Sequence, residues 1–227
     1  MSDSFEMRPI ARIRSDFGSK FGVPRQSGLV DALEAAVVFE EPYRNPDALR
    51  GLEGFSHIWL IWAFHQSQRP EWSPTVRPPR LGGNQRVGVF ASRSPFRPNP
   101  IGLSSVRLDH IAYTDALGPV LHVRGADLVD GTPILDIKPY LPYCDAKPEA
   151  KGGFTDGLSA AALSVDCPPA LLERLPETDR PGLLAVLAND PRPRYQNDPQ
   201  RLYGLTYAGH NVTFRVEDDT VAVIGVE

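Results

Sequence analysis

The chain has 227 residues, of which 41% are hydrophobic and 23% charged, and its formal net charge is -4. This composition is that of an ordinary globular protein, and no apolar run approaches the ~20 residues that span a bilayer. The first residues, MSDSFEMRPIAR, lack the basic start and apolar run of a signal peptide. We therefore expect a cytoplasmic protein with no membrane partner.

Metal and disulfide chemistry find little support in the sequence. Cys144 and Cys167 are the two cysteines, and they form no CxxC pair. The five histidines show no HExxH or other ligand spacing, so we expect no bound metal. The negative net charge counts against a nucleic-acid partner unless cationic side chains gather locally.

Proline occupies 23 positions, about twice its usual share of ~5%, which disfavours long helices. Stretches rich in β-branched and aromatic residues predict short strands. They cover residues 8–13, 36–40, 57–64, 86–92, 104–113, 120–128 and 134–140. Asn45 followed by proline predicts a helical turn over 46–52. The spacing of the strands predicts a mainly β fold, a meandering sheet or a barrel.

A polar segment with a glycine pair, CDAKPEAKGGF at 144–154, is typical of a link between two units. We therefore expect a β-barrel-like sheet domain over 1–148 and a small α+β domain over 149–227. Within the second domain the sequence predicts two short helices and a terminal β-hairpin. These lie at 170–175, 181–188 and 211–227.

Arginine is the only charged residue type between Arg77 and Leu108. The six arginines are Arg77, Arg80, Arg86, Arg93, Arg97 and Arg107. Three prolines around Arg97 stiffen its backbone and leave few backbone donors. Because a guanidinium matches carboxylate or phosphate oxygens with two parallel hydrogen bonds, one interpretation is an anion site. The other is a solvated face beside a proline-rich turn.

Four segments combine polar residues with turn chemistry beside strong strands. They are FGVPRQSG (21–28), GFSHIWLIWAFHQ (54–66), GVFASRSPFRPNPIGLSSVRL (88–108) and GADLVDGTPILDIKPYLPYCDA (125–146). Taken singly, each fits an ordinary turn or strand end. Together they resemble the TrmO family (YaeB or TsaA-like proteins), tRNA methyltransferases that use S-adenosylmethionine. DPRPRYQ at 190–196 also matches the longer members of that family.

The resemblance implies a β-barrel-like methyltransferase unlike the usual Rossmann type, and no GxGxxG opens a helix after a strand here. It also implies which positions hold the cofactor, S-adenosylmethionine. These are Pro24, Arg25, Gln26, His65, Gln66, Arg93, Leu103, Asp130, Gly131, Thr132 and Pro133.

The family reaction transfers a methyl group to the N6 atom of N6-threonylcarbamoyladenosine at position 37, in the tRNA anticodon loop. The implied partners are therefore that loop and a second copy of the chain in a homodimer. We assign Arg93 to the methionine carboxylate of the cofactor and Arg97 to the threonyl carboxylate of the substrate. Further substrate-binding candidates are Asn99, Lys138, Arg192 and Arg194.

The accepting nitrogen is a poor nucleophile, because its lone pair is delocalised into the purine and the adjacent carbonyl. A general base is therefore expected, and Asp136 and Tyr140 are the candidates. Asp136 equally suits a structural role with Lys138 or a backbone amide.

Aromatic side chains are further candidates, because they can stack unpaired bases. They are Phe96, Trp59, Trp62 and Tyr140, and for the two tryptophans a place in the core fits better. Two other functions stay open. One is a non-enzymatic module that senses S-adenosylmethionine or a nucleoside, and the other is methylation of another RNA.

Overall fold

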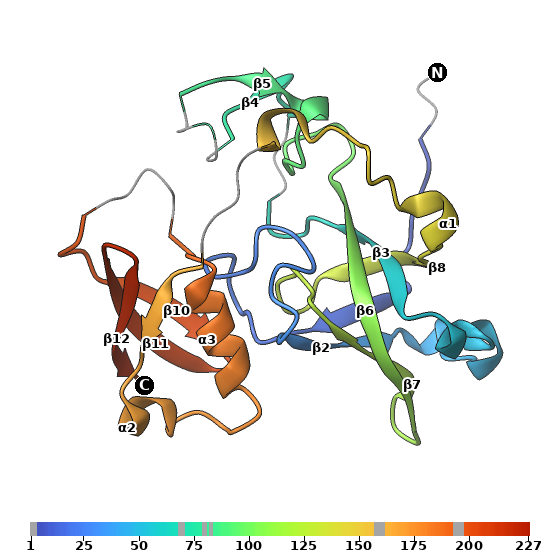
Figure 1. Cartoon of the computed structure of the whole chain (residues 1–227). Coiled ribbons are helices and arrows are strands. Elements are labelled where there is room, and N and C mark those ends of the chain that lie inside the picture. The colour runs from blue at the N-terminus through green and yellow to red at the C-terminus, as the bar shows by residue number, and fades with distance from the viewer. Residues whose placement is uncertain (1–3, 68–70, 79–80, 82–83, 157–161, 193–197) are drawn as a thin grey trace.

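The computed structural model describes residues 4–67, 71–78, 81, 84–156, 162–192 and 198–227. Six antiparallel strands close a barrel in the order β1-β2-β7-β6-β3-β8 (Figure 1). They are β1 (Ala11–Arg14), β2 (Glu34–Phe39), β3 (His57–Ala63), β6 (Ile101–Thr114), β7 (Gly118–Arg124) and β8 (Pro133–Pro139). The predicted mainly β, barrel-like fold is confirmed.

Alternating side chains explain why these segments form the barrel wall. In β3, Ile58, Leu60 and Trp62 are buried, while the residues between them are more exposed. A period of two places one set of side chains on the inner face of a strand. β6 continues the pattern with Gly102 and Ser104 on the inner face.

The prediction of a strand over 86–92 is wrong for most of its length. Only β5 (Val87–Gly88) is extended there, and it pairs with β4 (Thr75–Val76) in a small ribbon outside the barrel. A 3-10 helix, Val89–Ala91, follows at once. The hydroxyl of Ser92 donates to the carbonyl of Val89 at 2.8 Å, so a local side-chain bond competes with strand pairing.

Other 3-10 helices connect β2 with β3, at Glu41–Tyr43, Pro46–Leu49 and Leu52–Gly54, and a further one, Gly153–Thr155, lies between the barrel and the C-terminal unit. The predicted turn after Asn45 is confirmed in a shorter form, and the Asn45 side chain accepts a hydrogen bond from the amide of Asp47 at 3.0 Å. The short helix α1 (Pro142–Asp145) follows β8.

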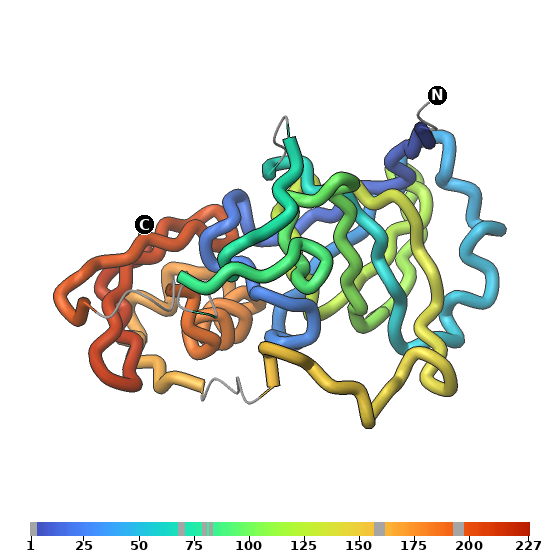
Figure 2. Tube along the Cα trace, turned by 90° about the horizontal axis from the view of Figure 1, so that it is seen from above, coloured from blue at the N-terminus to red at the C-terminus, as the bar shows by residue number. Residues whose placement is uncertain are grey.

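The C-terminal unit is a four-stranded sheet with two helices. In Figure 2 it forms the orange and red end of the trace, beside the barrel. Its elements are β9 (Ser164–Asp166), α2 (Pro169–Leu172), α3 (Arg180–Ala188), β10 (Tyr203–Tyr207), β11 (His210–Glu217) and β12 (Thr220–Val226). The predicted hairpin is confirmed in β11 and β12, with Asp218 in the left-handed conformation at the turn. No helix of the described residues combines the length and apolar character needed to cross a membrane.

The loop between β1 and β2 packs into the core of the C-terminal unit. Phe17, Val30 and Leu33 from this loop are buried in the same apolar cluster as α3 and β10 to β12. The ring of Phe17 meets that of Tyr207 edge-on at 5.6 Å. A boundary drawn at residue 148 thus leaves this N-terminal loop packed on the second unit.

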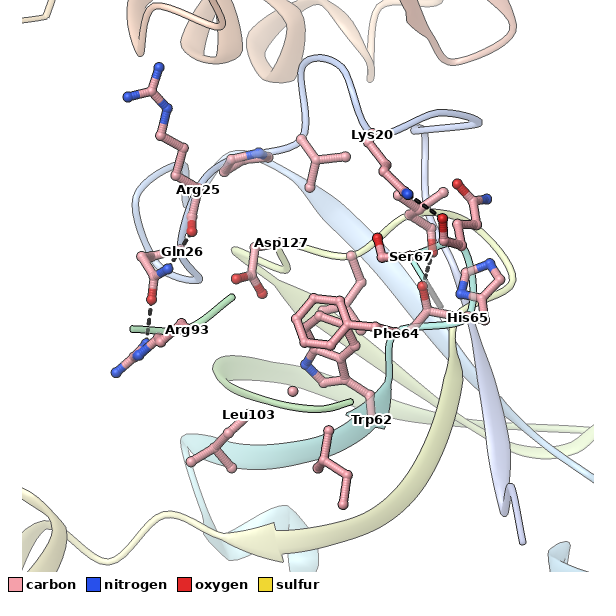
Figure 3. A pocket seen from close by; sticks show the side chains of 18 of the residues that line it. Lys20, Arg25, Gln26, Trp62, Phe64, His65, Ser67, Arg93, Leu103 and Asp127 are labelled. Carbon is pink, nitrogen blue, oxygen red and sulfur yellow. Dashed lines mark hydrogen bonds between the residues drawn. The ribbon is translucent and has the colours of Figure 1, made fainter. Parts of the chain in front are cut away.

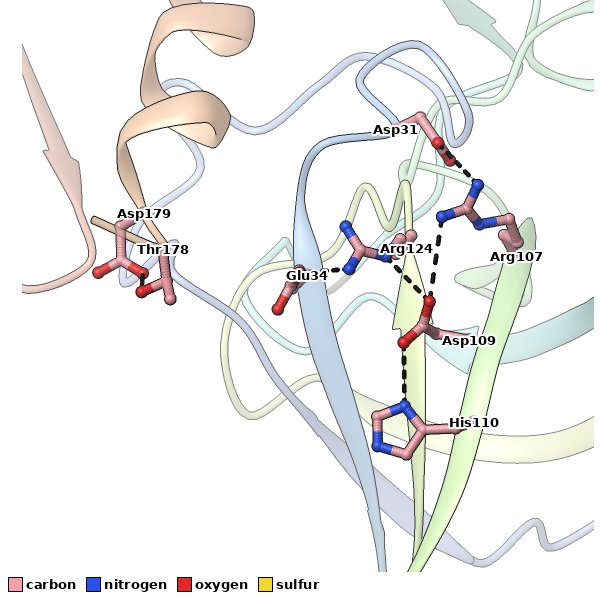
Figure 4. Close-up of polar contacts among 8 residues, drawn as sticks. All are labelled: Asp31, Glu34, Arg107, Asp109, His110, Arg124, Thr178 and Asp179. Atoms are coloured by element: carbon pink, nitrogen blue, oxygen red, sulfur yellow. Dashed lines mark hydrogen bonds and ion pairs between the residues drawn. The ribbon is translucent and has the colours of Figure 1, made fainter. Parts of the chain in front are cut away.

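Ion pairs tie β2, β6 and β7 together on the outside of the barrel (Figure 4). Arg124 contacts Glu34 and Asp109, and Arg107 contacts Asp31 at 3.2 Å. Hydrogen bonds from His110 and Arg124 hold the pKa of Asp109 below its usual range. Arg107 therefore pairs with acids on the outside of the barrel. The interpretation of the arginine-rich stretch as an anion site does not hold for this residue.

Candidate functional site

A cavity of about 530 Å³ lies where the β1–β2 loop, the end of β3 and the start of β6 meet (Figure 3). Eight of the eleven predicted cofactor positions line it, and Arg97 does too. The eight are Pro24, Arg25, Gln26, His65, Gln66, Arg93, Leu103 and Thr132. Segments separated by up to 108 positions in sequence thus meet in one pocket.

Aromatic rings form one wall of this cavity. Trp62 and Phe64 pack with ring centroids 4.3 Å apart at an angle of 60°. Gly102 lies against the Trp62 indole, so closely that a Cβ atom there would be 2.3 Å from the ring. The glycine therefore fixes how deeply the indole sits, and the wall suits a flat aromatic ligand.

Hydrogen bonds join the β1–β2 loop to the other walls. Arg25 Nη2 donates to the carbonyl of Arg192 at 2.6 Å, which connects the pocket with the C-terminal unit. Gln26 accepts from the Arg93 guanidinium, and Lys20 donates to the carbonyl of Gln66. The loop is consequently held at both of its pocket-lining ends.

The proline-rich segment is held by its backbone, as its stiffness predicts. The carbonyl of Phe96 accepts from the Ser73 amide at 3.1 Å, and the carbonyl of Pro100 accepts from the Phe64 amide at 2.9 Å. Between these points, Arg97 Nη1 makes one long contact of 3.4 Å to the carbonyl of Ser92. The partly buried guanidinium therefore keeps donors available for an anion.

Asp127 is a pocket residue that the sequence reasoning missed. Ser104 donates to its Oδ1 at 2.5 Å, and the Trp62 indole N–H donates to the Ser104 hydroxyl at 2.9 Å. Burial raises the pKa of the Asp127 carboxyl above its ordinary value. Asp127 lies in the GADLVDGTP segment, three residues before the Asp-Gly turn to which the resemblance assigned the cofactor positions.

Lys20 was missed as well, although it stands four residues before Pro24. The positive charge of Lys20 acts on the imidazole of His65. Partial burial, followed by the positive charges of Arg12 and Lys20, lowers the pKa of His65. The imidazole at the pocket wall is therefore neutral at neutral pH.

The predicted turn at 130–133 supports the pocket more than it lines it. Gly131 has the positive φ of 74° that the Asp-Gly sequence predicts, and its amide donates to Ile13. Asp130 accepts from the Ser15 amide at 3.0 Å, and Pro133 pairs with Arg12 of β1. Of these four residues only Thr132 lines the cavity.

The structure does not bring the two candidate bases into the cavity. Asp136 and Leu103 flank Ile61 on the outer face of the barrel, so Asp136 stands two strands, roughly 10 Å, from Leu103. Its carboxylate pairs with Lys138 at 2.9 Å and accepts from the Ile137 amide. Both contacts belong to the structural alternative described for it.

Tyr140 lies at the other end of β3 from the cavity. Its amide donates to the carbonyl of His57, and its ring packs 5.5 Å from that of Trp59. Six residue steps along β3 separate His57 from Ala63, a rise of roughly 20 Å. Within one chain, Tyr140 is too far from the cavity to touch a ligand there.

Of the candidates for substrate binding, Arg97 lines the cavity, whereas Asn99, Lys138 and Arg192 do not. Asn99 is exposed, and its carbonyl accepts from the Ile101 amide at 2.7 Å. Arg192 is largely buried, and its guanidinium is held by both carboxylate oxygens of Asp190. Arg192 therefore supports the contact between the units, while Arg194 and Arg80 lie outside the described residues.

The donor set of the pocket is rich in nitrogen cations and poor in metal ligands. Within the described ranges, no three histidine, cysteine or acidic side chains are grouped so that they could hold a metal ion. The described residues that line the pocket offer guanidinium and ammonium groups, one carboxyl group, an imidazole, hydroxyl and amide groups, and aromatic rings.

Two family models match the chain over most of its length. The model of the tRNA-methyltransferase O N-terminal domain matches residues 12–146, and the TrmO C-terminal domain matches residues 162–227. The chain belongs to the TrmO family. The resemblance seen in its four sequence segments is thereby confirmed.

Several TrmO-family relatives align over nearly the whole chain. The tRNA (adenine(37)-N6)-methyltransferase of Escherichia coli is 43% identical over 99% of this chain and 98% of its own. A Pseudomonas aeruginosa protein whose name is "Putative S-adenosylmethionine-dependent methyltransferase RcsF" is 42% identical over 87% of this chain and 86% of its own. A crystal structure of TrmO from Pseudomonas aeruginosa superposes with a TM-score of 0.81 at 34% identity, covering 100% of this chain and 98% of the other.

Proposed function

We propose that this protein is an S-adenosylmethionine-dependent tRNA methyltransferase that acts on N6 of N6-threonylcarbamoyladenosine at position 37. The observation that carries the proposal is the single pocket that gathers eight predicted cofactor positions together with Arg97. The names of the E. coli and P. aeruginosa relatives support the reaction and the methyl donor. The threonylcarbamoyl acceptor is supported by Arg97, which offers the cavity a cation for the threonyl carboxylate in addition to Arg93.

The pocket residues fit the proposed donor. The cavity of about 530 Å³ falls within the ~300 to 1,000 Å³ of small-molecule sites. Trp62 and Phe64 offer an aromatic wall to the adenine, and Arg93 offers a fork to the methionine carboxylate. When bound, S-adenosylmethionine supplies a methyl group activated by the positive sulfonium.

The chain contributes orientation and charge to the transfer. Arg97 would hold the threonyl carboxylate, and the backbone hydrogen bonds of the segment around it would help to orient the accepting nitrogen toward the donor. Such positioning supplies much of the acceleration in reactions between two bound molecules. In the balanced transfer the N–C bond would form as the S–C bond breaks, leaving a neutral thioether, and the N6 proton would pass to solvent water. Asp136, on the outer face of β8, can reach a pocket only across an interface with a second copy, as in the proposed homodimer.

The β4–β5 ribbon fits the anticodon loop beside the pocket. Trp72 and Phe90, which flank the ribbon in sequence, stack on each other with ring centroids 6.3 Å apart at 21°, and they are 49% and 73% exposed. Arg77 and Arg86 are exposed on the same ribbon, and Arg86 donates to Thr75 at 2.8 Å. Exposed rings and arginines together suit unpaired nucleotides, whose bases stack while their phosphates pair with cations.

Replacing Trp72 and Phe90 together by alanine should weaken tRNA binding by ~5- to 150-fold, at ~1 to 3 kcal/mol for one base stacked on the pair of rings. S-adenosylmethionine affinity should not change, because neither ring lines the cavity. Filter binding over a salt series measures the effect. In the same assay, Arg77→Gln with Arg86→Gln should flatten the salt dependence. If the alanine variant binds tRNA normally but becomes monomeric, the rings belong to a protein interface.

Binding of the donor is the simplest test of the proposal and of its alternatives. Calorimetry on chelator-treated protein should give a single S-adenosylmethionine site, and no heat at millimolar ligand would contradict the proposal. A sensor module would bind the ligand but transfer no labelled methyl group to bulk tRNA. An enzyme for another RNA would label a different acceptor.

A further inference from the structure

The charge balance of the pocket singles out one residue. Four cationic side chains line it, Lys20, Arg25, Arg93 and Arg97. Among the described lining residues, Asp127 is the one carboxylic acid. On the proposed function, the ligand itself carries two positive groups, an α-ammonium and a sulfonium, and one carboxylate. A net cation entering a cationic pocket needs a negative partner inside it.

Asp127 is held in place and keeps acceptor capacity. The Ser104 hydroxyl donates to Oδ1 at 2.5 Å, and Ser104 is itself fully buried and held by Trp62. An ionised carboxylate offers about four acceptor positions, so acceptor capacity remains for a group bound in the cavity.

The position of Asp127 relative to Arg93 decides which positive group it meets. Arg93 and Asp127 line the same cavity, and the positive charge of Arg93 acts on the Asp127 carboxyl. In an amino acid the carboxylate and the ammonium stand on the same carbon atom. A ligand whose carboxylate binds Arg93 therefore presents its ammonium within a few bond lengths of Arg93, inside the cavity that Asp127 also lines.

We propose that Asp127 binds the α-ammonium group of the amino-acid portion of the ligand. This inference rests on the proposed function, because it takes S-adenosylmethionine as the occupant. The hydrogen bonds from Trp62 to Ser104 and from Ser104 to Asp127 orient the Asp127 carboxylate. Arg93 binds the carboxylate of the same amino-acid portion. The amino-acid portion is thus recognised by two opposite charges, which gives both affinity and direction.

The test uses the full chain, the variant Asp127→Asn and three ligands. Asparagine keeps the size and still accepts from Ser104, but it removes the charge. The ligands are S-adenosylmethionine, S-adenosylhomocysteine, which lacks the sulfonium charge, and methylthioadenosine, which lacks the amino-acid portion. Asp127→Asn should weaken the first two alike, by ~10- to 150-fold for one lost charge-assisted bond, and leave methylthioadenosine unchanged. Asp115→Asn, an exposed acid in the turn after β6, controls for net charge.

Each other outcome has a definite meaning. If S-adenosylmethionine alone weakens, Asp127 faces the sulfonium, and if all three weaken, it serves the adenosine or the pocket wall. If no affinity changes but methyl transfer falls, it acts on the proton of the acceptor. All three results overturn the inference. If the wild type binds none of the ligands, the proposed function fails instead. Should Asp127→Asn not fold, Ser104→Ala replaces it and should give the same pattern more weakly.

Discussion

Replacing Arg97 by methionine should lower kcat/KM on threonylcarbamoylated tRNA by ~30- to 5,000-fold, since truncating a buried charge-assisted pair costs ~2 to 5 kcal/mol. Arg97 lines the cavity and, among the described residues, makes one long hydrogen bond, so donors remain for the proposed carboxylate. Arg97→Lys should recover part of the loss, because lysine keeps the charge but not the planar fork.

Steady-state kinetics with two tRNAs make this prediction specific. The loss should appear on tRNA carrying the threonylcarbamoyl group, so both variants should discriminate less against tRNA with plain adenosine. Arg50→Lys is the matched control, because Arg50 is exposed and pairs with Asp47 outside the pocket. If an Arg97 variant instead weakens S-adenosylmethionine binding and leaves tRNA discrimination intact, the assignments of Arg93 and Arg97 are reversed.

Gly102→Ala should lower the free energy of unfolding by ~2 to 4 kcal/mol and weaken S-adenosylmethionine binding at the same time. The added Cβ would lie 2.3 to 2.6 Å from three atoms of the Trp62 ring. The indole would have to move, at the ~1 to 3 kcal/mol of overpacking, and it would lose its ~1 kcal/mol hydrogen bond to Ser104. Its displacement would also remove the support behind Asp127.

Urea unfolding and calorimetry together test this prediction. Gly204→Ala is the control, because Gly204 also lies within a strand, β10, and has open space where its Cβ would stand. That variant should bind S-adenosylmethionine as the wild type does. A Gly102→Ala protein with unchanged stability and unchanged affinity would show that Trp62 has freedom to shift and does not set the pocket wall.

The local sequence pattern was sufficient to predict the strands of the barrel. The alternation in β3 and the β-branched residues of β7 and β8 are properties of a few consecutive residues, and the strands predicted from them are present. The segment at 86–92 looked equally strand-like, but Gly88 and the Ser92 hydroxyl favour a turn there. Competition between a side-chain bond and a strand ladder depends on geometry that composition does not contain.

The sequence predicted only part of the pocket, because the role of some lining residues depends on partners far away in the chain. Family resemblance supplied eight lining positions, but it said nothing of Asp127, whose meaning depends on Ser104 and Trp62. Those partners are 23 and 65 positions away, so only the closed barrel brings them to one carboxyl group. Packing of the β1–β2 loop against the C-terminal unit is likewise a tertiary contact, since Phe17 and Val30 look like ordinary loop residues in sequence.

The acceptor nucleoside is identified by following the methyl group itself. Purified protein is incubated with methyl-labelled S-adenosylmethionine and with the same tRNA in two forms, one threonylcarbamoylated at position 37 and one with plain adenosine there. Mass spectrometry of the digested nucleosides then locates the label. We expect the label on N6 of threonylcarbamoyladenosine and none on the unmodified tRNA. Label on plain adenosine, on another nucleoside, or on neither tRNA would contradict the account.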